Sequence, residues 1–128
     1  MNISENTRVT HADIVARGWD AVAKGDWDTL VADYADDMIF VMPGQQDTLN
    51  GRAAFRDALD NFGTALPPGL EITGLRFVGE SDEVVTLIDW KSDKIPDGSH
   101  AAVLFRFEGD LIVEERWFVD TEEWKSAF

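Results

Sequence analysis

Apolar residues recur every three or four positions in three stretches of the first half of the chain. This spacing places them on one face of an α-helix. Asp26 favours a helix start, whereas Gly25 and the pair Pro67-Pro68 favour helix ends. The sequence therefore predicts three helices, the first over residues 10–24. Their apolar faces carry Val15, Trp19 and Val22 in the first, Trp27, Leu30, Val31 and Tyr34 in the second, and Phe55, Ala58, Leu59 and Phe62 in the third.

The pattern changes to strands at one place in the first half and throughout the second half. The apolar run from Met38 to Met42 stops at Pro43-Gly44, which favours a short buried strand. Later runs rich in β-branched and aromatic residues are separated by short polar breaks that contain glycine, as in antiparallel hairpins. A sequence resembling a capping box opens a short terminal helix at Asp120. The later strands are predicted over residues 70–78, 83–91, 101–107 and 111–119.

Length and composition are those of one folded domain. The chain has 128 residues, and we expect a single domain over residues 1–128. An apolar fraction of 45% is sufficient for a packed core. No apolar run approaches the ~18 residues of a membrane span. Because the start of the chain is polar and acidic, unlike a secretory signal, we expect a cytoplasmic protein without a membrane partner.

Residue types and charge exclude several kinds of site. The chain has no cysteine and only two histidines, His11 and His100, which excludes thiolate chemistry and a three-histidine zinc site. We therefore expect no metal and no other cofactor. The formal net charge of −14 repels phosphate backbones, so we also expect no nucleic-acid partner.

Three stretches resemble the nuclear transport factor 2-like superfamily and its SnoaL-like members. Residues 25–37 resemble its opening motif, residues 50–55 the start of its third helix, and residues 112–120 its last strand. The superfamily includes ketosteroid isomerases, limonene-epoxide hydrolases and SnoaL-like polyketide cyclases. The resemblance implies an α+β fold in which three N-terminal helices pack on a strongly curved, mainly antiparallel sheet, forming a cone with an internal pocket. Because this fold serves many activities, it does not define a function.

The resemblance also marks where ketosteroid isomerases carry their catalytic groups. The carboxylate base corresponds to Met42, which precedes Pro43, and a thioether cannot transfer protons. The protonated acid that holds the oxyanion corresponds to Val103, and the helix tyrosine falls near Gly18 or Trp19. We expect this isomerase chemistry to be absent.

The positions of two other chemistries are likewise apolar. The Arg and Asp residues of limonene-epoxide hydrolases correspond to Ile88, Trp90 and Trp117. The His–Asp pair of SnoaL-like cyclases corresponds to Val103 and Trp117. Neither catalytic set is present in this chain, so we expect no hydrolysis of limonene epoxide and no cyclisation by a His–Asp pair.

Strand alternation and the resemblance together predict an apolar pocket. Aromatic and methionine side chains suit a flat or hydrocarbon ligand, so we expect a small apolar molecule as partner. The alternative is that the same residues only fill the core. The predicted lining consists of Trp19, Phe40, Met42, Ile88, Trp90, Val103, Phe105, Trp117 and Val119.

Glu115 is the candidate catalytic residue. It shares a strand face with Trp117 and Val119, and the resemblance implies that this face is the inner one. Burial of an unpaired carboxylate between Trp90 and Trp117 would raise its pKa and suit it to proton transfer. The alternative is that the strand twists outward and leaves Glu115 solvated.

Three other polar residues near the predicted pocket have more ordinary interpretations. Asp120 is expected to cap the terminal helix, or to be a pocket acid if the register shifts by one residue. Asp89 is expected to face outward and to pair with Arg106 or Arg116. His100 begins a strand near the pocket mouth, where an edge hydrogen bond competes with a catalytic role.

The other sheet face mixes apolar and charged residues and is not covered by helices in the expected fold. We expect it to form a homodimer interface. The sequence thus predicts a small-molecule pocket protein, either an enzyme of the isomerase, dehydratase or cyclase type that uses Glu115, or a non-catalytic ligand carrier or dimeric assembly module. The mixed face carries Val85, Leu87, Ala102, Leu104 and Phe118 beside Asp89, Lys91, Arg106, Glu114 and Arg116.

Overall fold

The computed structural model describes residues 9–41 and 48–128. Its helices are α2 (His11–Lys24), α3 (Trp27–Val31), α4 (Arg52–Leu59), the 3-10 helix η1 (Phe62–Ala65) and α5 (Thr121–Ser126). Its strands are β1 (Tyr34–Val41), β2 (Thr48–Asn50), β3 (Glu71–Val78), β4 (Glu83–Lys91), β5 (Ser99–Glu108) and β6 (Leu111–Val119). Within the described ranges, no helix is long and apolar enough to cross a membrane.

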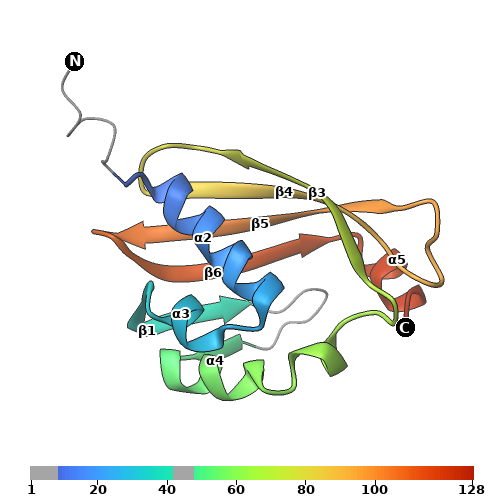
Figure 1. Ribbon diagram of the computed structural model, residues 1–128, viewed down its shortest axis with the longest axis horizontal. Coiled ribbons are helices and arrows are strands. Elements are labelled where there is room, and N and C mark those ends of the chain that lie inside the picture. The colour runs from blue at the N-terminus through green and yellow to red at the C-terminus, as the bar shows by residue number, and fades with distance from the viewer. Residues whose placement is uncertain (1–8, 42–47) are drawn as a thin grey trace.

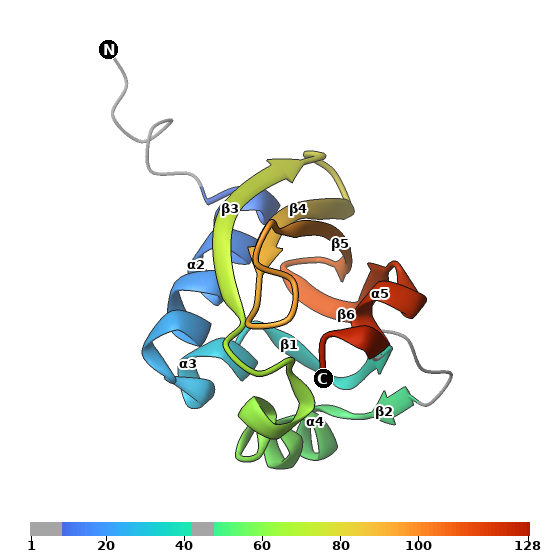
Figure 2. The ribbon, with the colours of Figure 1, turned by 90° about the vertical axis from the view of Figure 1, so that its right-hand side faces the viewer.

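One curved sheet organises the structure (Figures 1 and 2). The strand order is β2-β1-β6-β5-β4-β3; β1 and β6 are parallel, and the other pairs are antiparallel. Helices α2 and α4 pack on one face of the sheet with α3 packed against both of them, while α5 lies at one end of the sheet (Figure 1). The sheet is curved but not closed. The expected fold class is therefore confirmed.

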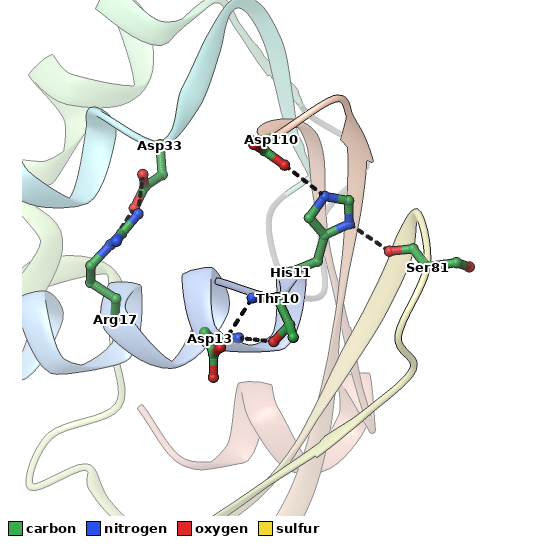
Figure 3. A network of polar contacts seen from close by, with 7 residues as sticks. All are labelled: Thr10, His11, Asp13, Arg17, Asp33, Ser81 and Asp110. Atoms are coloured by element: carbon green, nitrogen blue, oxygen red, sulfur yellow. Dashed lines mark hydrogen bonds and ion pairs between the residues drawn. The ribbon is translucent and has the colours of Figure 1, made fainter. Parts of the chain in front are cut away.

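Helix α2 has the start and the end that its sequence predicts. The Thr10 hydroxyl accepts a hydrogen bond from the Asp13 backbone, and the Asp13 carboxylate accepts one from the Thr10 backbone (Figure 3). Gly25 ends the helix with a φ of 67°, a left-handed conformation that glycine adopts without strain. The apolar face between these caps faces the sheet and carries the fully buried Ile14 and Val15.

A β-bulge in β6 decides which of its side chains enter the core. Phe107 pairs with Ile112, but the preceding Arg106 pairs with Glu114, so Val113 is the extra residue. Because side chains alternate between the two faces of a strand, one extra residue reverses the face on which each later residue lies. Glu115 consequently lies on the same inner face as Ile112.

Several element bounds differ from those expected; β5, for example, extends beyond residues 101–107 at both ends. The second helix ends at Val31, so Tyr34 begins β1 instead of extending the helical face. The third helix ends at Leu59, and a 3-10 turn precedes Pro67. Thr48–Asn50 forms a short strand beside β1 that the pattern did not indicate, because three residues are too few to show alternation. Met42 lies outside the described residues.

Candidate functional site

The buried carboxylate of Glu115 is held by two donors. The Tyr34 hydroxyl donates a hydrogen bond to Oε1, and Trp117 Nε1 donates one to Oε2 at 2.7 Å. The parallel pairing of β1 with β6 brings Tyr34 to this carboxylate across 81 positions of sequence. Only 7% of the Glu115 surface is exposed. The predicted burial is therefore found, but the prediction of an unpaired carboxylate is wrong.

Burial also changes the acidity of both partners. It raises the pKa of Glu115, and the hydrogen bonds from Tyr34 and Trp117 oppose part of this change because they favour the ionised form. Burial, followed by the negative charge of Glu115, raises the pKa of Tyr34 well above 10.0. Tyr34 thus stays protonated and remains a donor while Glu115 gains or loses a proton.

A narrow inner cavity borders this carboxylate. Its volume is about 30 Å³, enough for one or two water molecules. Helices α2, α3 and α4 and strands β1, β5 and β6 contribute most of its walls. The lining residues are Ile14, Val15, Gly18, Trp19, Val22, Leu30, Asp33, Tyr34, Phe40, Phe55, Leu59, Phe62, Phe105, Ile112, Glu115 and Trp117.

A larger outer cleft adjoins the inner cavity. Its volume is about 480 Å³, and it lies between the α4–η1 segment and α5. Five residues line both spaces and form a shared wall: Phe40, Phe55, Leu59, Phe62 and Trp117. The remaining lining residues of the outer cleft are Leu49, Ala58, Thr64, Ala65, Leu66, Trp124, Lys125 and Phe128.

Aromatic contacts fix the shared wall. Phe55 packs against Phe40 and Tyr34, with ring centroids 5.1 and 5.0 Å apart. Trp117 meets Trp19 edge to face at 6.0 Å. Such contacts restrict ring rotation, so each donor to Glu115 is itself held in place by packing.

The predicted pocket residues divide between the cavities and the core. Trp19 and Phe105 line the inner cavity, whereas Phe40 and Trp117 line both spaces. The other described members lie on the inner sheet face but line neither of these two spaces; Trp90, for example, packs against Trp124 with centroids 5.5 Å apart. These members are Ile88, Trp90, Val103 and Val119.

Tyr34 is the main site residue that sequence reasoning missed. Tyr34 follows Leu30 and Val31 at helical spacing, so the sequence pattern assigned it to the helix and not to the strand that begins there. Tyr34 is the only tyrosine of the chain, and a buried candidate acid needs a hydrogen-bond donor. Together, these two facts could have indicated its role. Phe55 and Phe62 were assigned to a helix face but not to the pocket.

The other polar candidates have structural partners. Asp120 caps α5 by accepting a hydrogen bond from the Glu123 backbone, as expected. Asp89 pairs with His100 at 2.7 Å, so its expected pairing with Arg106 or Arg116 is wrong. Those two arginines bind Glu114 instead, because it is their neighbour on the outer face.

Polar contacts of α2 anchor the helix over the cavity (Figure 3). The His11 ring lies 2.6 Å from the Ser81 carbonyl oxygen and 3.3 Å from the Asp110 carboxylate. Arg17 binds Asp33, a lining residue of the inner cavity, at 2.7 Å. Asp33 is thus neutralised by a cation, which leaves Glu115 as the inner-cavity carboxylate without one. Among the described residues, no group of three His, Asp or Glu is arranged to hold a metal ion.

Comparisons with known proteins agree with this architecture. The family model described as "SnoaL-like domain" matches residues 15–115. An NTF2-like protein from Burkholderia xenovorans LB400 is 20% identical, with 93% of this chain and 97% of that chain covered and a TM-score of 0.70. A candidate polyketide cyclase from Pseudomonas putida KT2440 is 12% identical, with 94% and 100% covered and a TM-score of 0.74.

A further similar structure is that of TerC, co-crystallised with polyporic acid. It is 16% identical, with 91% of this chain and 96% of that chain covered and a TM-score of 0.74. At these identities, the likeness to solved structures establishes the fold alone. No curated protein matches the chain in sequence.

The buried carboxyl makes stability depend on pH in a testable way. The folded-state pKa of Glu115 is raised from 4.5, so its contribution to stability is greatest below that pH and is lost as pH rises through the folded-state pKa. The free energy of unfolding of Glu115→Gln should therefore increase relative to wild type between pH 4.5 and neutral pH. Urea unfolding at several pH values measures this difference.

The neighbouring Glu114 provides a control of opposite sign. Hydrogen bonds from Arg116 and Arg106 lower the pKa of Glu114, so its contribution is present at neutral pH and is lost as pH falls. Glu114→Gln should lose stability relative to wild type as pH rises. The same trend in both variants would contradict the assignment of Glu115.

Proposed function

Because the chain belongs to the SnoaL-like domain family, we propose that it binds a small apolar or aromatic molecule in the outer cleft and uses Glu115 as an acid or base. The observation that carries this proposal is the shared aromatic wall. One side of Phe40 and Trp117 borders a cleft of ligand size, and the other borders a cavity that contains a buried carboxylate. Apolar binding and proton transfer would thus occur at one site.

Glu115 has properties suited to proton transfer. Its raised pKa keeps the neutral form available, and this form can donate to a ligand carbonyl. The ionised form can accept a proton, and Tyr34 and Trp117 would stabilise its charge. An isomerisation, a dehydration or a cyclisation needs such a proton-transfer group.

Two structural relatives support this choice of ligand and reaction. One is a candidate polyketide cyclase, and another was crystallised with polyporic acid. Cyclisation in this chain would require a different catalytic group from the His–Asp pair, because Val103 lies in the core and Trp117 bonds Glu115.

A non-catalytic ligand carrier is the second candidate, and one observation favours it. The space beside Glu115 has room for only one or two water molecules, and each carboxylate oxygen already accepts a hydrogen bond. In a carrier, Glu115 would position Tyr34 and Trp117 without contacting the ligand.

The outer sheet face supports a proposed homodimer. Leu104, Val85 and Leu87 are half-buried on this face, and Phe118 is 52% exposed. Cross-strand pairing places Leu104 beside Val85 and Arg116, which joins the apolar residues to a charged rim. A face of this kind fits a second copy of itself across a twofold axis.

The cleft assignment predicts binding of a neutral aromatic probe. N-phenyl-1-naphthylamine should bind the wild type with enhanced fluorescence. Ala58→Trp should weaken binding by about an order of magnitude, because the indole occupies volume that the probe needs. Ala53→Trp is the matched control, since Ala53 is exposed on the same helix but lines neither cavity. Equal weakening by both variants would contradict the cleft assignment.

The acid–base assignment predicts base catalysis on a simple aromatic substrate. The ionised Glu115 should remove the ring C–H proton of 5-nitrobenzisoxazole, which breaks the N–O bond and releases a coloured cyanophenolate. Glu115→Gln should abolish the acceleration, whereas Glu114→Gln should retain it. The rate should rise with pH through a midpoint above 4.5, because the ionised form is the base. Equal rates in wild type and Glu115→Gln would favour the carrier.

The dimer proposal predicts a mass of about twice the 14.3 kDa of the chain by light scattering. Leu104→Asp or Phe118→Asp should shift the protein toward monomer, because each would bury a carboxylate in the interface. Val9→Asp should not, since Val9 is 54% exposed just before α2, which packs on the opposite face of the sheet. A monomeric wild type at high micromolar concentration would contradict the proposal.

A further inference from the structure

We infer that the outer cleft selects apolar ligands that carry an acidic group, and that Lys125 binds this group. The inference rests on the proposed function, because it assumes that the cleft takes a small molecule. It adds the class of ligand: an aromatic or alicyclic body with a carboxylate, a sulfonate or an ionised phenol.

The charge of the cleft wall is opposite to that of the chain. The chain contains 25 acidic and 11 basic residues. None of the acidic residues that the structure describes lines the outer cleft, where Lys125 is the single ionisable side chain among the described lining residues. An anionic group would therefore meet an attractive charge here, although the molecule as a whole repels anions.

Lys125 also differs from most basic residues in having no carboxylate partner in the described part of the chain. Seven of the other described basic residues form ion pairs with Asp or Glu within 4.0 Å. Lys125 forms none there. Most other basic residues of this protein are neutralised by carboxylates, whereas the Lys125 ammonium group is available to a ligand.

The neighbours of Lys125 supply the apolar part of the binding site. Lys125 follows Trp124, which is buried on α5 and lines the same cleft. Phe128 closes this side, and the Lys94 ammonium group donates to its main-chain oxygen. Among the neutral lining side chains, Thr64 already donates its hydroxyl hydrogen to the Asn61 carbonyl oxygen at 2.7 Å, and Trp117 Nε1 donates to Glu115. Lys125 is thus the cationic donor in the described lining.

Two probes with the same aromatic body and different charge test this inference. 1-Anilinonaphthalene-8-sulfonate carries a sulfonate, and N-phenyl-1-naphthylamine is its neutral counterpart. The wild type should bind the sulfonate more tightly in fluorescence titrations at low ionic strength, and added salt should reduce the difference. Lys125→Gln should weaken sulfonate binding roughly 1.4- to fivefold, in the range of solvent-exposed ion pairs, and leave the neutral probe unchanged.

Matched variants separate a local contact from a change in net charge. Lys24→Gln removes the same charge from α2, where Lys24 pairs with Asp20 far from the outer cleft lining, and should leave both affinities unchanged. Lys125→Arg should keep the preference for the sulfonate. Equal effects of Lys125→Gln and Lys24→Gln, or equal affinity of the wild type for both probes, would overturn the inference. Failure of the wild type to bind the neutral probe would instead overturn the proposed function.

Discussion

A carboxylate is stable in an apolar interior only when hydrogen-bond donors replace the water that it loses. Glu115 meets this requirement through Tyr34 on β1 and Trp117 on its own strand. The arrangement constrains the rest of the interior, because both donors also belong to the aromatic wall. Tyr34 packs on Phe55, and Trp117 packs on Trp19. The position of the polar group and the shape of the apolar surface are therefore set by the same side chains.

The wall separates two environments with different chemistry. On one side, the inner cavity is small and contains the polar group whose pKa is raised by burial. On the other, the outer cleft is large and apolar, with a single lysine in its described lining. A ligand in the cleft would meet a hydrophobic surface, a cation at one edge, and a carboxyl group behind the wall. Access to that carboxyl group distinguishes an enzyme from a carrier, because proton transfer requires contact and binding does not.

Most of the fold could be predicted from the sequence, because hydrophobic period and turn residues act locally. The strands β4 and β6 have the expected bounds, and the caps at Thr10 and Asp120 form as their residue types indicate. The local signal failed at Tyr34, where a helical spacing continued into a strand. It also failed for Asp89, because the exposed face offered several partners and sequence does not show which one is nearest.

The sequence by itself determined an α+β domain with an acidic net charge and a set of apolar faces, and strand alternation placed Glu115, Trp117 and Val119 on one face. These features follow from residue type and short-range periodicity, whereas the inward direction of that face was implied by the family resemblance and is found in the structure, where Glu115 is 7% exposed. Only the tertiary structure decided what surrounds that carboxylate. The pairing of β1 with β6 brings Tyr34 next to Glu115. Trp90 packs against Trp124 of α5 and does not border the carboxylate. Contacts between strands distant in sequence depend on how the whole sheet curves, and no local pattern records that curvature.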